Sequence, residues 1–278
     1  MTAAKTVFIS YRRTNAHTAR AIAHDLTAHG YDVFMDHDAL DSGQHADLIR
    51  RQIAGRAHFV MILTPSAVRR CVNINDWVRQ EVRVAIDSCR NVIPVLLAGR
   101  GFPDVERFLT GQLAVLGSYD PCFFDPADPA GSLAHLRSHH LTLPPLMPTQ
   151  SAPESDTAYV AAQQAITADL PPATPDQLRA EQIAERANAA AFNRRAYRRA
   201  LPDYDTALTL NPADPMVYLY RGMVHAAMKQ HNAALEDFSE ASRRDPEMAA
   251  PHYQRSRILA AQGEAAAADV ALAQAIAL

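Results

Sequence analysis

Apolar and polar residues in the first half of the chain alternate between two kinds of segment. Short apolar runs occur at 6–11, 31–35, 58–63 and 92–97, and the last two are unbroken, as expected of strands that are buried on both faces of a sheet. Residues 16–29, between the first two runs, have apolar side chains at helical spacing. This alternation predicts an α/β domain with a mostly parallel sheet.

Two further signals refine the helices of this half. The first helical segment stops at Gly30, a residue suited to the left-handed conformation that ends many helices. A polar stretch at 36–45 follows the second apolar run, and residues 47–53 then have the pattern of a second helix.

A proline-rich segment separates the two halves. Seven of the 18 prolines lie at 144–175, on both sides of an Ala-rich stretch at 157–170 that has the composition of a helix. Thr174-Pro175-Asp176-Gln177 then has the form of a capping box that starts a helix. We therefore predict a domain at 1–143, a linker with a short helix at 144–175 and a helical domain at 176–278.

The helical domain repeats every 34 residues. Three positions recur at this period and form columns when the units are aligned. Two columns hold a small residue, Ala200, Ala234, Ala268 and Ala207, Ala241, Ala275, and the column between them holds a large apolar residue, Tyr204, Phe238, Leu272. With prolines at the unit boundaries, this pattern resembles the tetratricopeptide repeat, in units of about 181–214, 215–248 and 249–278. The outer units depart from the family pattern, because Asn188 and Ser256 stand where the middle unit has Gly222. The alternative is a generic Ala-rich helical bundle.

Composition excludes several functional classes. The 27 basic and 30 acidic residues give a net charge of −3, so we expect neither nucleic acid nor an anionic membrane as a partner. No apolar run reaches the length of a membrane helix, and the first ten residues do not resemble a signal peptide. The three cysteines lack CxxC spacing, which favours reduced thiols and a cytoplasmic protein.

The first strand-like run continues as Phe8-Ile9-Ser10-Tyr11-Arg12-Arg13, which resembles the opening signature of TIR (Toll/interleukin-1 receptor-like) domains. Residues 32–36, 59–65 and 76–81 follow in the order and spacing of that family, and the resemblance covers about 5–143. It implies an α/β flavodoxin-like doubly wound parallel sheet, here followed by an all-α domain of helical hairpins. Such sheets bind ligands beyond the carboxyl ends of their strands.

The Asp76-Trp77-Val78-x-x-Glu81 form is closest to the NAD-cleaving members of the TIR family. The resemblance implies that Glu81 is the catalytic glutamate of an NAD+ nucleosidase, with nicotinamide and ADP-ribose or cyclic ADP-ribose as products. The nicotinamide of NAD+ is a cationic leaving group, so the reaction needs one carboxylate that stabilises positive charge on the ribose rather than an added acid. The alternative is that Glu81 is a solvated carboxylate on a helix face, between Arg79 and Arg83.

Other residues of the motifs are candidates for binding NAD+, each with a structural alternative. Arg12 and Arg13 have guanidinium groups that bind a pyrophosphate, or they fix the loop or are ordinary solvated arginines. Tyr11 and Trp77 line the same site or pack into the core. Asp36 contacts the ligand or belongs to a turn.

The loop after the second strand holds the last two candidates. Gly43 is expected there for its backbone freedom, with ordinary turn chemistry as the alternative to ligand contact. His45 stands where catalytic relatives usually have a larger aromatic residue that stacks on the ligand, so we expect weaker stacking. No histidine pair has helical metal-ligand spacing with a carboxylate in place, and we predict no metal and no cofactor, with NAD+ as the substrate.

These features together predict an NAD+ glycohydrolase controlled by its repeats, with a role in immunity, antiviral defence or cell-death signalling that the resemblance implies. The rival is a non-catalytic adaptor in which the TIR and repeat domains only bind partners, and a third possibility is an exported effector. We also expect a protein or peptide partner on the repeat surface. Because residues 270–278 end the chain without a polar capping helix, we expect self-association through the repeats as well as the TIR domain.

Overall fold

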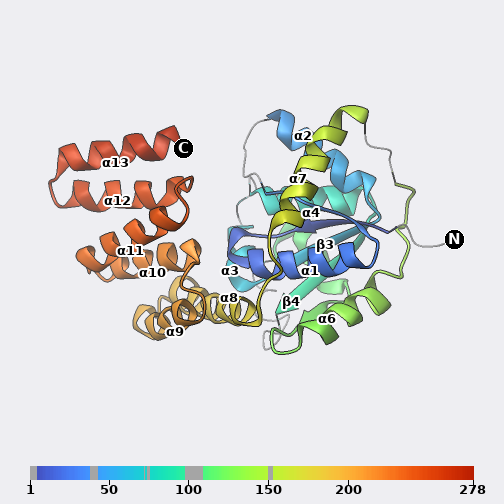
Figure 1. Cartoon of the computed structure of the whole chain (residues 1–278), viewed down its shortest axis with the longest axis horizontal. Coiled ribbons are helices and arrows are strands. Elements are labelled where there is room, and N and C mark those ends of the chain that lie inside the picture. The colour runs from blue at the N-terminus through green and yellow to red at the C-terminus, as the bar shows by residue number, and fades with distance from the viewer. Residues whose placement is uncertain (1–4, 38–42, 72, 74–75, 98–108, 150–152) are drawn as a thin grey trace. The chain divides into compact units, whose positions relative to one another are not determined.

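The computed structural model describes residues 5–37, 43–71, 73, 76–97, 109–149 and 153–278, and gives only the main-chain course for residues 43–45, 70 and 112. The chain divides into two compact units, Met1–Leu178 and Arg179–Leu278 (Figure 1).

The first unit is built on a five-stranded parallel sheet. Its strands are β1 (Thr6–Ser10), β2 (Asp32–Met35), β3 (His58–Leu63), β4 (Asn91–Leu97) and β5 (Cys122–Phe124). Their order in the sheet is β2-β1-β3-β4-β5, with every neighbouring pair parallel. The chain thus starts in the interior of the sheet and winds outward in both directions, which confirms the predicted doubly wound α/β fold.

Helices cover both faces of this sheet. They are α1 (Ala16–Ala28), α2 (Gly43–Gly55), α3 (Pro65–Arg70), α4 (Trp77–Asp87) and α6 (Pro129–His135), with short helical turns η1 (Arg13–Asn15), η2 (Gly111–Ser118) and η3 (Leu136–His140) between them. Successive strand residues point to opposite faces. Accordingly, Val7 and Ile9 pack in the core under α1, whereas Phe8 packs in the core under α2 and α4.

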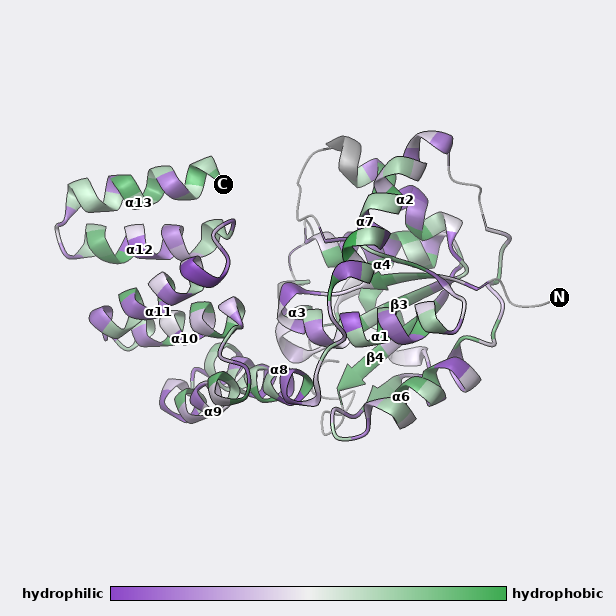
Figure 2. Ribbon diagram, in the orientation of Figure 1, coloured by the Kyte–Doolittle hydropathy of each residue, from purple (hydrophilic) through white to green (hydrophobic). Residues whose placement is uncertain are grey.

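The apolar runs of the sequence coincide with the strands. β3 is buried along its whole length and β4 at every position after Asn91. Figure 2 shows that both strands are mostly hydrophobic. Helix α1 ends before Gly30, which has a φ of +77°, a conformation that other residues rarely adopt. Helix α2 is longer than predicted and begins at Gly43. Local patterning therefore located these elements to within a few residues.

The segment at 144–175, assigned from sequence to a linker, contains the turn η4 (Glu154–Asp156) and helix α7 (Thr157–Asp169). The helix predicted at 157–170 is α7, and it lies against β2 and α1 of the first unit (Figure 1). Helix α8 (Pro175–Asn188) then begins at the predicted capping box, where the Thr174 and Gln177 side chains bond each other's main-chain amides over 3.2 and 3.0 Å.

The second unit is a series of antiparallel helical pairs. After α8 and the turn η5 (Ala189–Asn193) come α9 (Tyr197–Leu210), α10 (Pro215–Ala227), α11 (His231–Arg244), α12 (Ala249–Ala261) and α13 (Ala265–Ala277). Helix α10 packs on α11 and α12 packs on α13. Within the described residues, no helix has both the length and the apolar character that crossing a lipid bilayer requires.

The repeat columns differ in how they pack. Phe238 is fully buried, and its ring lies so close to Gly222 that a Cβ on this glycine would be 2.7 Å from it. At the same positions of the preceding repeat, the buried Tyr204 donates a 2.6 Å hydrogen bond to Oδ1 of Asn188. Asn188 therefore replaces a close glycine contact with a hydrogen bond. Leu272, expected at the corresponding packed position of the last unit, is 39% exposed.

Candidate active site

The candidate site lies at the carboxyl ends of β1 and β2 and on helix α4. Ser10 is the last residue of β1, Asp36 directly follows β2, and Glu81 is in the second turn of α4. Because β1 and β2 are parallel neighbours, their carboxyl ends meet at one edge of the sheet. Residues that are distant in the sequence are thereby brought together.

Glu81 is buried. Only 6% of its surface is exposed, and its Oε2 accepts a hydrogen bond of 2.6 Å from the Ser10 hydroxyl. The Trp77 indole, one helical turn earlier, also favours the ionised form of this carboxyl and lowers its pKa. The solvated carboxylate that the neighbouring arginines suggested is therefore not what the fold produces.

Burial changes the acidity of Glu81. The net effect raises its pKa from 4.5 to about 7, and loss of solvent is the largest cause. The negative charge of Asp36 raises the pKa further, whereas the Ser10 hydrogen bond, the charge of Arg12 and the Trp77 indole lower it. Because this pKa lies near neutral pH, the carboxylate is ionised in a substantial fraction of molecules at that pH. A poorly solvated carboxylate interacts strongly with any positive charge that develops beside it.

Arg12 fixes the start of the helix that carries Glu81. Its Nη2 forms a 2.5 Å ion pair with Asp76, and the same carboxylate accepts from the main-chain amide of Arg79 and so caps α4. The Cys71 thiol also donates to Asp76, and burial raises the pKa of this thiol to about 12. Cys71 is therefore an unreactive, protonated thiol.

The predicted role of Arg12 in binding pyrophosphate stays a prediction. The structure shows that Arg12 bonds Asp76, which is the expected loop-fixing contact. The Nε atom of Arg12 is buried and has no hydrogen-bond partner within the described residues. Arg13 begins the short turn after β1 and is exposed.

Tyr11 and Asp36 link the ends of the two strands. The Tyr11 hydroxyl donates a 3.1 Å hydrogen bond to the main-chain oxygen of Asp36, and the tyrosine ring packs against the core under α1. The carboxylate of Asp36 accepts a 2.7 Å hydrogen bond from the Tyr159 hydroxyl. Tyr11 thus packs against the core and also bonds Asp36 of the candidate site.

The remaining candidates lie on α2 and α4. Trp77 is half-buried and packs against the core under α2 and α4, which is the structural alternative expected for it; its role in lining the site stays a prediction. Gly43 is the first residue of α2. The side chain of His45, also in α2, lies outside what the structure describes, as do residues 38–42.

Three residues around the candidate site were not singled out from the sequence. Ser10 was noted only as part of a motif, although its position at the end of β1, in the TIR signature, is a signal for the site. Asp76 was treated as a motif residue, whereas its place directly before α4 is a capping signal. Nothing in the sequence linked Tyr159 to Asp36.

No metal centre is found in the described part of the chain. There, no group of three or more histidine, cysteine, aspartate or glutamate side chains is arranged to hold a metal ion. The candidate chemistry of this site therefore consists of one buried carboxylate, its hydrogen-bond donor Ser10 and the nearby charges of Arg12 and Asp36.

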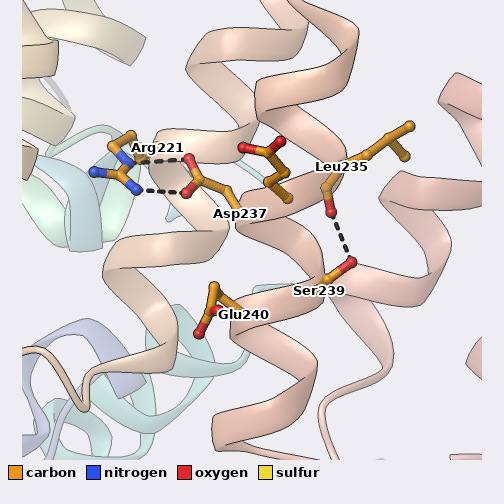
Figure 3. A pocket seen from close by; sticks show the side chains of 6 residues that line it. Arg221, Leu235, Asp237, Ser239 and Glu240 are labelled. Atoms are coloured by element: carbon orange, nitrogen blue, oxygen red, sulfur yellow. Dashed lines mark hydrogen bonds and ion pairs between the residues drawn. The ribbon is translucent and has the colours of Figure 1, made fainter.

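The second unit has a surface pocket of its own (Figure 3). It is lined by Arg221, Leu235, Glu236, Asp237, Ser239 and Glu240. Arg221 binds Asp237 through two hydrogen bonds, of 3.0 and 2.6 Å, and also pairs with Asp205. The Ser239 hydroxyl donates to the main chain of Leu235. The Arg221–Asp237 pair joins α10 to α11, and the Arg221–Asp205 pair joins α10 to α9.

A comparison with protein families identifies the first unit. The family described as TIR domain matches residues 7–123. Residues 7–123 are a TIR domain. The resemblance seen in the sequence motifs is thereby confirmed, and the TIR domain includes the sheet from Val7 into β5, together with Ser10, Asp36 and Glu81.

Several characterised proteins are similar to parts of this chain. The "NAD(+) hydrolase sarm1" of Drosophila melanogaster is 37% identical over 105 residues, which are 36% of this chain and 8% of that protein. The "NAD(+) hydrolase tir-1" of Caenorhabditis elegans is 33% identical over 118 residues, 41% of this chain and 12% of that protein. The chain thus spans about a tenth of the length of these relatives.

A third relative has a name that includes the repeat family. The "Tetratricopeptide repeat and J domain-containing co-chaperone DNJ1" of Cryptococcus neoformans is 37% identical over 93 residues, 34% of this chain and 18% of that protein.

Proposed function

We propose that the TIR domain is an NAD+ nucleosidase. The observation that carries the proposal is the buried Glu81, which has a raised pKa and lies at the carboxyl ends of the parallel strands. The names of the Drosophila and Caenorhabditis relatives support the same reaction. The products would be nicotinamide and either ADP-ribose or cyclic ADP-ribose.

In this reaction the bond between the nicotinamide nitrogen and the ribose carbon breaks. The bonding electrons go to nicotinamide, which loses its positive charge, and the positive charge passes to the ribose. The Glu81 carboxylate stabilises that cation because it is negative, poorly solvated and held by Ser10. Water then adds to the ribose and releases a proton, which gives ADP-ribose; an adenine nitrogen adding instead gives the cyclic product.

The test is nicotinamide release from NAD+ by the full-length protein, followed by chromatography. We expect Glu81→Gln to lower kcat about a hundredfold to a thousandfold, as for the loss of one preorganised electrostatic group. Glu264→Gln, the same change at an exposed residue of the second unit, is the matched control and should retain wild-type activity. If Glu81→Gln keeps more than about a tenth of wild-type kcat, Glu81 is not the catalytic carboxylate.

The alternative function is a non-catalytic adaptor. The buried pairing of Ser10 with Glu81 favours the enzyme, because burying a carboxylate is costly and a binding module has no need of it. A wild-type chain that releases no nicotinamide would favour the adaptor.

We also propose that the chain self-associates. Helix α13 and the residue after it expose the large apolar side chains of Val270, Leu272, Ile276 and Leu278, which supports contact with a second copy. Light scattering of the full-length protein, compared with a variant in which Val270 and Ile276 are changed to Ser, tests this. A wild-type protein that stays monomeric at high micromolar concentration contradicts it.

A further inference from the structure

Helix α7 lies outside the residues that match the TIR family, and its fully buried residues are polar. Its buried residues are Gln163 and Thr167, and Asp156 directly before it is also buried. Buried polar side chains require specific partners, so a helix docked through them fits in one position only. Helix α7 is thus held against the first unit by directed hydrogen bonds.

The first set of these bonds is made to the free edge of the sheet. β2 is an edge strand, and edge strands leave main-chain groups unpaired. Gln164 donates from Nε2 to the main-chain oxygen of Val33 over 3.0 Å, and Gln163 accepts from the main-chain amide of His37 over 2.8 Å. His37 in turn bonds the Thr167 hydroxyl over 2.8 Å through Nε2. Helix α7 therefore pairs with main-chain groups at the edge of β2 and at His37, two residues after the strand.

The second set reaches α2. The Asp156 carboxylate binds the guanidinium of Arg51 through two hydrogen bonds, of 3.0 and 2.8 Å, and accepts another from Gln52. These bonds attach the start of α7 to α2. Helix α7 is therefore anchored to the elements on both sides of residues 38–42.

The contact nearest to the candidate site is made by Tyr159. Its ring packs against Phe34, with ring centroids 6.4 Å apart, and its hydroxyl donates to the Asp36 carboxylate over 2.7 Å. The strand register pairs Ile9 with Met35, so Asp36 follows β2 beside the end of β1, where Ser10 bonds Glu81. The charge of Asp36 also acts on Glu81. Tyr159 is thus one hydrogen bond away from a charge that the catalytic candidate experiences.

We propose that Tyr159 is a positioning residue of the TIR active site: through its hydroxyl, helix α7 holds the Asp36 carboxylate in a fixed place beside Glu81. This inference rests on the proposed NAD+ nucleosidase function. It makes the catalytic unit longer than the TIR match, because a helix more than thirty residues beyond that match contributes to the site.

The physical reason lies in how a developing cation is stabilised. Electrostatic catalysis depends on charges that are already in place when the positive charge forms. Asp36 and Glu81 both contribute negative potential at the site, and loss of the Tyr159 hydroxyl removes one of the bonds that fix the position of Asp36. Loss of the Tyr159 hydroxyl should therefore lower kcat and leave KM little changed.

The experiment is a double-mutant cycle in the full-length protein, with Tyr159→Phe and Asp36→Ala measured singly and together. Tyr159→Phe keeps the ring on Phe34 and removes only the hydroxyl, and we expect kcat to fall about tenfold, the lower end of what a hydrogen bond to a charged group contributes. In the Asp36→Ala background, Tyr159→Phe should change kcat by less than about twofold, because the two residues act as one unit. The matched control is Tyr31→Phe, the same change just before the opposite end of β2.

Hydrogen exchange gives a readout that does not depend on activity. The His37 amide donates to Gln163, so Gln163→Ala should speed its exchange at least about tenfold if α7 is docked in solution, while β4 amides stay unchanged. Unchanged exchange at His37 overturns the proposal.

The outcomes separate the two hypotheses. An active wild type with Tyr159→Phe at wild-type kcat, or with losses that multiply in the double mutant, overturns the role of Tyr159 and leaves the nucleosidase function standing. A wild type that releases no nicotinamide overturns the proposed function and the catalytic role of Tyr159 with it, while the exchange at His37 still reports whether α7 is docked.

Discussion

The Ser10 hydroxyl and the Glu81 carboxylate form a buried hydrogen bond of 2.6 Å between residues 71 positions apart. The bond joins the end of β1 to helix α4, and it opposes the effect of burial on the acidity of Glu81. Burial raises the pKa of this carboxyl to about 7, whereas the bond favours the ionised form. Several measurable properties follow from this balance.

The first is the dependence of activity on pH. The reaction needs ionised Glu81, whose charge is influenced by Arg12 and Asp36 and by Ser10 and Trp77. We expect kcat/KM to rise as pH increases through about 7 and then to level off. Nicotinamide release measured between pH 5 and 9 checks this, and a rise centred near 4.5 would show that Glu81 is solvated in the working enzyme.

Ser10→Ala should move that profile upward. Without the hydroxyl, the ionised carboxylate loses a hydrogen bond and the pKa of Glu81 rises further. Activity at pH 7 should therefore fall several-fold, with a smaller loss at pH 9, where Glu81 is ionised in both proteins. Ser118→Ala, at an exposed serine of the same unit, serves as the control. An equal loss at both pH values would instead point to a damaged site.

Ionised Glu81 should also lower the free energy of unfolding at high pH. The pKa is about 7 in the folded protein and near 4.5 when the side chain is solvated, so the folded state binds the proton more tightly and stability falls as pH rises between these values. At about 1.4 kcal/mol for each tenfold in proton affinity, the full effect is up to roughly 3 kcal/mol. Glu81→Gln should therefore raise the melting temperature at pH 8 and have little effect at pH 4.5. A variant that melts lower at pH 8 contradicts this.

Activity should not require a metal ion. The proposed reaction uses one carboxylate and a leaving group that is already cationic, and the described residues contain no metal-ligand cluster. We expect nicotinamide release to be unchanged by an excess of EDTA. Loss of activity that one divalent ion restores would disprove the mechanism.

Gly222→Ala should destabilise the second unit. The added Cβ would lie 2.7 Å from the Phe238 ring, and crowding of this kind in a packed core typically costs about 1–3 kcal/mol. Urea unfolding of the full-length protein measures the change. Phe238→Leu removes the crowded ring. Gly222→Ala should therefore lower the free energy of unfolding less in the Phe238→Leu variant than in the wild type. If Gly222→Ala is neutral, the two helices have room to separate.

Short-range patterns in the sequence determined the elements. The unbroken apolar run at 58–63 is β3, Gly30 ends α1 with a positive φ, and Thr174 with Gln177 caps α8. Each depends on residues within a few positions of one another, since helix caps and strand patterns are local in origin. The TIR motifs add the order of the sheet, because they identify the domain.

Only the tertiary structure decided which charged groups are buried and what they contact. Glu81 lies between Arg79 and Arg83 in the sequence, which suggests solvent, yet its partner is Ser10 from another element. Asp36 is likewise held by Tyr159, from a segment that the sequence presents as a linker. Local patterns do not encode such pairings, because the free energy of a buried charge depends on neighbours that only the folded chain brings together.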